Sequence, residues 1–129
     1  MLIVLDNSNP APLYQQIVDQ VRAKVLAGEI QPGTQLPSIR QLAADLLTSV
    51  ITTKRAYQEL EAAGLIQTRP GRGTYVCELT ESSRQRLKLA EVEDHIREAV
   101  QAAARLGIRR PQLVELLERM MEAEGLDDE

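Results

Sequence analysis

Aromatic residues are almost missing from this chain of 129 residues, which has three Tyr and neither Phe nor Trp. The hydrophobic core must therefore be built mainly from Leu, Ile, Val, Ala and Met. This scarcity disfavours an all-β sandwich, in which aromatic side chains usually fill the space between sheets, and it favours helices. It also leaves no platform on which the bases of a single-stranded nucleic acid could stack.

Residues that could carry metal, redox or catalytic chemistry are equally scarce. The single cysteine is Cys77 and the single histidine is His95. This excludes an intramolecular disulfide framework, a zinc finger and a His-rich metal site. No Ser/His/Asp arrangement, Walker loop or Rossmann glycine pattern is visible. We therefore expect no metal, no cofactor and no enzymatic activity.

Long apolar runs and an excess of positive charge are also missing. No run approaches the roughly 20 apolar residues of a membrane span, and no targeting segment is visible, so we expect a cytoplasmic protein without membrane association. The net charge is −4, but residues 1–77 carry seven basic and six acidic residues, whereas residues 78–129 carry eight and thirteen. The two segments therefore differ in their electrostatic roles, and their partners must be considered separately.

Helical periodicity organises the first half of the chain. Apolar residues recur every three or four positions over 12–27, which predicts an amphipathic helix. A second, short helix begins behind Ser38, and a third spans 50–63 behind Ser49; both serines suit an N-cap. The core side of the third helix is expected to carry Thr53, Ala56, Tyr57 and Leu60.

A hairpin is expected after the third helix. Two β-like runs, 65–68 and 74–76, flank a Gly- and Pro-containing tip at 69–73. A further strand of one or two residues is expected at 35–36. The pattern over residues 1–77 therefore predicts three helices followed by a small β-wing.

The apolar pattern changes after Ser82. It predicts one long helix of about 20 residues, ending near Gly107, and a second helix after Pro111. This apolar stripe is longer than one short helix needs, and the chain itself offers little surface to cover it. We therefore expect residues 78–129 to be a helical dimerisation region of a homodimer. The residues expected at the interface are Leu89, Val92, Ile96, Val100, Ala103, Leu113, Leu116, Leu117 and Met120.

Two short helices joined by a tight turn and followed by a hairpin form the plan of a winged helix-turn-helix. In that plan the second helix enters the major groove of double-stranded DNA, and the first crosses the phosphate backbone. All the basic residues of 30–77 fall in these helices and the hairpin tip, where glycines let the backbone approach a duplex. The candidate DNA-binding residues are Arg40, Ser49, Val50, Thr52, Lys54, Arg55, Arg69, Gly71, Arg72, Gly73 and Thr74.

Ordered motifs extend from the first helix to the hairpin. They comprise Gly28-x-Ile-x-Pro-Gly-x-x-Leu-Pro-Ser-x-Arg-x-Leu-Ala, then Gly64-Leu-Ile and Gly71-Arg-Gly-Thr-Tyr-Val. Together they resemble the GntR family of bacterial transcription regulators. The stretches Pro12-Leu-Tyr-Gln-Gln-Ile and Ser49-Val-Ile-Thr-Thr-Lys-Arg-Ala-Tyr-Gln-Glu-Leu are similar to its small YtrA-type subfamily.

The resemblance implies a homodimeric repressor that binds a near-palindromic operator. It implies a phosphate or base contact for Arg40, and polar or basic contacts for Ser49, Thr52 and Lys54 at the start of the recognition helix. It assigns no effector ligand to this chain. The alternative from the residues is a winged-helix protein-interaction module whose acidic C-terminal helices recruit a partner.

Two departures from the family pattern bear on the site. Val50 stands where many members place an arginine, so their operator sequences should not be transferred to this chain. Leu47 and Thr48 replace the usual Gly-Val pair in the turn between the helices. A leucine there must either adopt a strained left-handed conformation or shift the turn.

Overall fold

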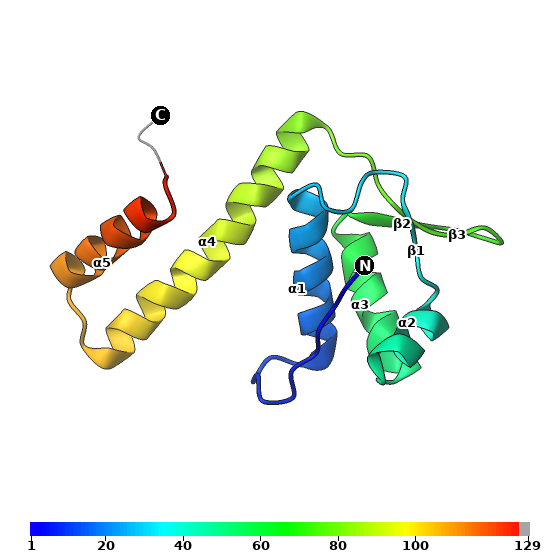
Figure 1. Ribbon diagram of the computed structural model, residues 1–129, viewed down its shortest axis with the longest axis horizontal. Coiled ribbons are helices and arrows are strands. Elements are labelled where there is room, and N and C mark those ends of the chain that lie inside the picture. Colours follow the sequence, from blue (N-terminus) through cyan, green and yellow to red (C-terminus); the bar gives the residue numbers. More distant parts are fainter. Residues whose placement is uncertain (127–129) are drawn as a thin grey trace. The chain divides into compact units, whose positions relative to one another are not determined.

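The computed structural model describes residues 1–126, and its N-terminal part is a helical domain with a small sheet (Figure 1). The first compact unit, residues 1–87, contains helices α1 (Leu13–Leu26), α2 (Ile39–Leu46) and α3 (Val50–Ala62). The expected helices are confirmed. The ends of α1 move inward by one residue because Pro12 serves as the N-cap and Ala27 as the C-cap.

The wing is a three-stranded antiparallel sheet. It consists of β1 (Gln35–Leu36), β2 (Ile66–Arg69) and β3 (Gly73–Val76), with β3 in the centre. Arg69 pairs with Gly73 and Ile66 with Val76, so the hairpin expected from the sequence is confirmed. Figure 1 shows it projecting away from the three helices. Leu65, expected in the first strand, instead precedes it and is buried in the core.

The core lies between α1, α2 and α3, and it is almost entirely aliphatic. Tyr57 is its one aromatic member: the hydroxyl donates to the Pro37 carbonyl oxygen at 2.6 Å, and burial raises the pKa of that hydroxyl. Thr53 is fully buried, as its place on the core side of α3 predicts. The main contributors from α1 and α3 are Ile17, Val18, Val21, Val25, Ala56 and Leu60.

Leu47 makes the turn between α2 and α3 with φ 54° and ψ 43°, and no other non-glycine residue within 1–126 has a positive φ. Its N–H donates to the Ala44 carbonyl at 3.3 Å, and the Thr48 N–H donates to that of Ala43 at 3.0 Å. The structure thus resolves the open alternative in favour of the left-handed conformation. A Cβ in this region costs about 1–2 kcal/mol, and the side chain gains little packing in return because it is 94% exposed.

Helix α4 (Glu81–Leu106) starts earlier than expected and has 26 residues. Thr80 Oγ1 accepts a hydrogen bond from the Ser83 N–H at 3.1 Å, which gives the helix an N-cap at Thr80. The first turns carry mostly polar residues, so no apolar periodicity marked them in the sequence. The prediction of about 20 residues followed the apolar stripe alone and was therefore too short.

The start of α4 belongs to the N-terminal unit, and the compact units divide after Leu87. Leu79 and Leu87 pack against the N-terminal core. Arg84 Nη1 donates to two carbonyl oxygens at the end of α1, at 3.2 and 3.4 Å. The compact unit therefore extends beyond the boundary expected after residue 77. The functional division into a reader and a dimerisation region stays a prediction.

The second compact unit, residues 88–129, contains the rest of α4 and helix α5 (Arg110–Ala123). Its last three residues lie outside the described part of the chain. Helix α4 ends at Leu106; Gly107 follows with φ 71°, and the Ile108 N–H donates to the Ala103 carbonyl at 2.9 Å. This is the hydrogen bond of a Schellman cap. None of the described helices combines the length and the apolar character that crossing a membrane requires.

Candidate nucleic-acid interface

The N-terminal end of α3 carries the polar residues expected at the start of a recognition helix. Ser49 is the N-cap: its Oγ accepts the Thr52 N–H at 3.0 Å and donates to Thr52 Oγ1 at 2.8 Å. Val50 follows with 47% of its surface exposed. The two hydroxyls are thus fixed by each other, at the end of the helix where partial positive charge favours a phosphate.

The two cations of α3 have different surroundings. Lys54 is exposed, and its ammonium group has no hydrogen bond or ion pair with any other residue in 1–126. Arg55 is stacked on Tyr14 of α1, with its Cζ 3.8 Å from the ring centre and its Nη2 donating to the Tyr14 hydroxyl at 3.1 Å. Arg55 therefore ties α3 to α1, while Lys54 is free to contact a ligand.

A groove of about 540 Å³ runs between the start of α2 and the wing. Arg40 of α2, Arg69 of β2 and Arg72 of the wing tip all line it. The guanidinium groups of Arg40 and Arg72 have no partner among the described residues. This groove brings together three of the cations predicted from the sequence, and it contains no acidic lining residue.

The wing tip is a tight turn braced by a residue that the sequence analysis missed. The Arg72 N–H donates to the Arg69 carbonyl at 2.9 Å, and Gly71 between them has φ 75°, as a type II turn requires. Gly73 has φ 124°, and a Cβ there would lie 2.5 Å from Gln35 Nε2. Gln35 uses that nitrogen to donate to the Arg72 carbonyl at 3.1 Å.

The two remaining wing candidates are held by the strands. Arg69 lies over the ring of Tyr75, with 4.9 Å between its Cζ and the ring centre. Thr74 is only 9% exposed, and its Oγ1 lies 3.4 Å from that of Thr68 on the neighbouring strand. Thr74 therefore offers little surface to a ligand. The guanidinium group of Arg69, in contrast, is oriented by its contact with the Tyr75 ring.

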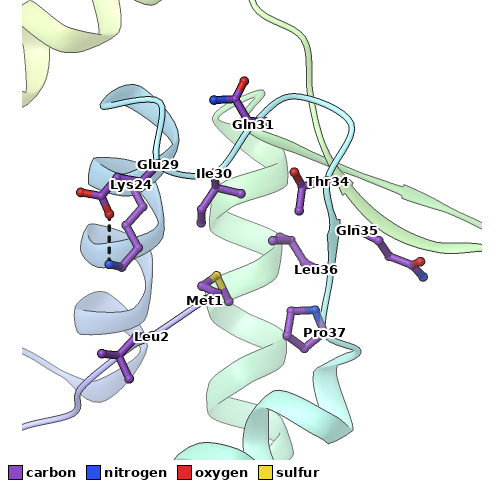
Figure 2. Close-up of a pocket in the computed structure, with 10 residues that line it drawn as sticks. All are labelled: Met1, Leu2, Lys24, Glu29, Ile30, Gln31, Thr34, Gln35, Leu36 and Pro37. Carbon is purple, nitrogen blue, oxygen red and sulfur yellow. Dashed lines mark hydrogen bonds and ion pairs between the residues drawn. The ribbon is translucent and has the colours of Figure 1, made fainter.

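A second hollow, of about 600 Å³, lies beside the N-terminal segment (Figure 2). It is lined by Met1, Leu2 and the loop after α1, and an ion pair between Lys24 Nζ and Glu29 Oε2, 3.3 Å apart, stands at its edge. None of the DNA-binding candidates lines it.

The lone cysteine lies in surroundings that disfavour reactivity. Cys77 is half-buried, and burial, reinforced by Glu61, raises the pKa of its thiol. The thiol form is thereby favoured over the nucleophilic thiolate. Within 1–126, no group of three or more His, Cys, Asp or Glu residues could hold a metal ion.

Seven of the nine residues expected at a dimer interface are exposed on the two C-terminal helices. Their exposed members are between 38% and 70% exposed. Ala103 is buried and Leu113 is half-buried. The exposed members are Leu89, Val92, Ile96 and Val100 on α4 and Leu116, Leu117 and Met120 on α5.

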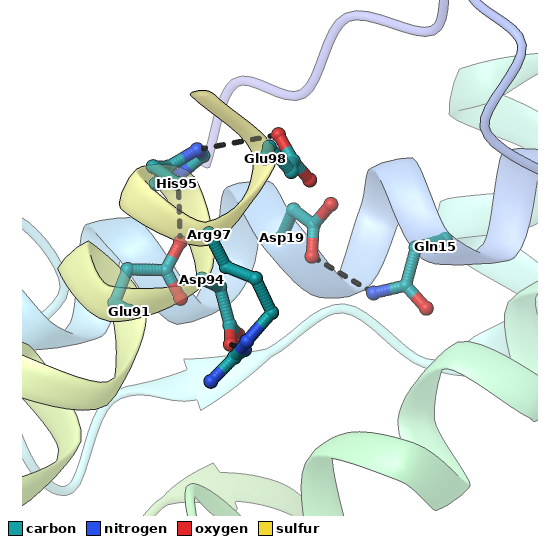
Figure 3. Close-up of polar contacts among 7 residues, drawn as sticks. All are labelled: Gln15, Asp19, Glu91, Asp94, His95, Arg97 and Glu98. Atoms are coloured by element: carbon teal, nitrogen blue, oxygen red, sulfur yellow. Dashed lines mark hydrogen bonds and ion pairs between the residues drawn. The ribbon is translucent and has the colours of Figure 1, made fainter. Parts of the chain in front are cut away.

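The other sides of α4 are polar (Figure 3). His95 Nε2 lies 3.5 Å from Glu91 Oε1, and Arg97 Nη1 lies 3.0 Å from Asp94 Oδ1. The Glu91 side chain is partly buried, at 20% exposed, whereas Arg97 and Asp94 are both exposed, and an exposed pair one helical turn apart contributes little to stability. Helix α4 is therefore amphipathic along its C-terminal part, with a solvated polar side and an apolar side that is left exposed.

Comparison with known proteins decides the family. The family model described as bacterial regulatory proteins, gntR family, matches residues 13–76. The HTH-type transcriptional repressor YtrA of Bacillus subtilis (strain 168) is 31% identical over 119 residues, which cover 92% of this chain and 92% of that protein. The chain belongs to the GntR family. The resemblance in the sequence motifs is thereby confirmed, and the chain is a DNA-binding transcription regulator.

Solved structures agree with this assignment. A GntR family transcriptional regulator from Listeria monocytogenes has a TM-score of 0.72 at 28% identity, over 89% of this chain and 98% of that one. AraR(DBD) in complex with operator ORE1 has a TM-score of 0.50 at 25% identity, over 60% and 94% of the two chains. The family members matched here are transcription regulators, so the expectation of a non-enzymatic function is confirmed.

Within this GntR fold, sequence reasoning located the cations but missed the residues that orient them. Tyr14, Tyr75 and Gln35 each hold a predicted residue or its backbone in place. Tyr14 and Tyr75 occur in the family motifs, so the motifs were an available signal. Gln35 had none, because its contact joins residues 37 positions apart.

Proposed function

We propose that this chain is a homodimeric repressor that reads a near-palindromic operator with the N-terminal end of α3 and the wing. The observation that carries the proposal is the set of unpaired cations on α2, α3 and the wing tip, namely Arg40, Lys54 and Arg72. Unpaired surface cations suit phosphates because binding releases counterions from the duplex.

Each element has a distinct role in the proposed complex. Helix α3 enters the major groove with its N-terminal end, where Ser49, Thr52 and Lys54 reach base edges or flanking phosphates. Arg40 lies at the start of α2, the helix that crosses the backbone, and neutralises a phosphate. The wing places Arg72 and the small Gly71 against the backbone or minor groove beside it.

The exposed apolar surface of α4 and α5 supports a homodimer. Large contiguous apolar surface is rare on soluble monomers and marks interaction sites. A single recognition helix reads too few base pairs for specificity, whereas a two-fold dimer doubles the contacts and explains a near-palindromic site. The similar YtrA protein is named a repressor, and we extend that sign of regulation, and a cytoplasmic location, to this chain.

Titration of labelled duplexes tests the proposed contacts. Fragments from upstream of the chain's own operon should bind in a sequence-specific and salt-sensitive manner in fluorescence anisotropy. Arg40→Ala should weaken binding by about 1–3 kcal/mol and make it less dependent on salt. The matched control is Arg97→Ala, which removes a cation paired with Asp94 and should leave the affinity unchanged.

A reporter-gene assay of regulation distinguishes the alternative function from the proposed one. If the fold serves as a protein-interaction module, the double variant Lys54→Ala/Arg72→Ala should regulate as the wild type does. Absence of sequence-specific, salt-sensitive binding by the wild-type chain would contradict the proposed function itself.

A further inference from the structure

Three large apolar side chains are exposed where α2 turns into α3, beside the cations of the proposed interface. Leu47 is 94% exposed, Val50 47% and Ile51 80%. Single exposed apolar residues are common on proteins. Here, however, three of them lie within 47–51, at the end of a helix expected to enter the major groove. This grouping indicates a ligand with an apolar group.

Ile51 lies on the outward side of α3. It precedes Lys54 by three residues and Arg55 by four, so it shares their side of the helix. A hollow of about 560 Å³ on this outer face is lined by all three residues. The buried Thr53 marks the opposite side. A duplex held by Lys54 would therefore be in reach of the Ile51 side chain.

We propose that Ile51, with Val50 beside it, recognises thymine through its C5 methyl group. An isoleucine side chain has no hydrogen-bonding group, so it cannot read the donors and acceptors of the base edges. Thymine alone among the four bases offers an apolar group in the major groove. The proposal rests on the proposed function and adds the base that this part of α3 selects.

The surroundings of the apolar side chains favour DNA over a protein surface as their ligand. Lys54 and Arg55 line the same hollow against one carboxylate, that of Glu59, and Lys54 has no partner within 1–126, so the positive charge of the lining outweighs the negative and favours an anionic ligand. Ser49 and Thr52, fixed by their mutual hydrogen bond, flank Val50 and Ile51 with further polar groups. Together these side chains suit a base edge with a methyl group next to a phosphate.

The test replaces thymine by deoxyuridine, which lacks only the methyl group. Binding sites are first selected from a random duplex library with the full chain, and each thymine of the selected duplex is then replaced singly. Anisotropy titration should show Kd rising about fourfold at the contacted thymine, as expected for one buried methyl-sized group. Ile51→Ala should abolish this sensitivity, so that thymine and deoxyuridine duplexes bind equally.

Two controls keep the result specific. Ile51→Val retains an apolar side chain and should retain the sensitivity to deoxyuridine. Val4→Ala shortens an apolar side chain of the N-terminal segment that is 65% exposed, and this variant should also retain the sensitivity to deoxyuridine.

Each other outcome overturns the proposal. A selected site without thymine, indifference to deoxyuridine at every position, or a sensitivity that persists in Ile51→Ala would leave DNA reading intact but refute methyl recognition. An Ile51→Ala variant with unchanged binding to every duplex would assign the apolar surface to another macromolecule. If no sequence is enriched at all, both this inference and the proposed function fail.

Discussion

Leu47 has left-handed backbone angles, which glycine adopts more easily than other residues. The turn between α2 and α3 requires these angles. The hydrogen bonds of a helix C-cap are present: the Leu47 and Thr48 N–H groups reach the carbonyls of Ala44 and Ala43. The leucine side chain has almost no contacts to offset the left-handed conformation. Backbone strain of this kind persists where the surrounding structure determines the turn.

Replacing Leu47 by glycine should therefore stabilise the protein. Glycine removes the Cβ penalty, but its freedom in the unfolded chain offsets part of the gain, so we expect an increase of about 0.5–1 kcal/mol in the free energy of unfolding. Urea denaturation measures it. Leu47→Ala keeps the Cβ and should show no such gain; equal stability of the two variants would mean that the turn is unstrained.

The residue types of the candidate DNA contacts were predictable from the sequence. Which of these side chains are free to contact DNA was not. Lys54 and Arg55 are neighbours with the same charge, yet Arg55 is stacked on Tyr14, 41 positions away. Thr74 lies next to the wing arginines in sequence but faces Thr68 inside the sheet. Such differences depend on contacts between distant segments, which local patterns do not encode.

Among the elements, α4 shows most clearly what the sequence pattern predicts and what it misses. Its long apolar stripe made the helix predictable, as the 3.6-residue period did for α1 and α3. Its true start was missed because the first turns are polar; the Thr80 cap was a local signal for it, whereas the contact of Arg84 with the end of α1, 59 positions away, had none. Arg84 also places a positive charge at the partially negative C-terminus of α1.

Removing the Arg84 side chain should loosen this connection. Arg84→Ala leaves the last carbonyl groups of α1 without their cationic donor, and we expect a loss of about 1 kcal/mol in the free energy of unfolding. Thermal and urea denaturation provide the measurement. The control is Arg86→Ala, an exposed cation on the same helix; a similar loss in both variants would refute a specific role for Arg84.

For the whole molecule, the distribution of charge and apolar surface separates two roles along the chain. The net charge of −4 is the sum of two unequal parts. Residues 78–129, with eight basic and thirteen acidic residues, carry −5, and residues 1–77, with seven and six, carry +1. An acidic C-terminal segment would be repelled by DNA, so a protein–protein contact suits its exposed apolar residues better. The chain as a whole can therefore be acidic and still bind a duplex.

A charge placed in this apolar surface should dissociate the proposed dimer. Val100→Glu puts a carboxylate at a position that is 51% exposed in the single chain, so the fold should survive while burial at an interface becomes costly. Light scattering coupled to size exclusion should report a monomer, with an unchanged circular dichroism spectrum. The exposed neighbour Gln101, replaced by Glu, should leave the dimer intact; a dimeric Val100→Glu would place the interface elsewhere.

A hydroxyl-radical footprint on a duplex selected by the full chain tests whether the protein binds its operator as a sequence-specific dimer. We expect two protected half-sites related by a two-fold axis, separated by one helical turn or a multiple of it, and both protections should weaken together in Val100→Glu. Protection of a single half-site, or uniform protection without sequence preference, would contradict a dimeric, sequence-specific operator-binding protein.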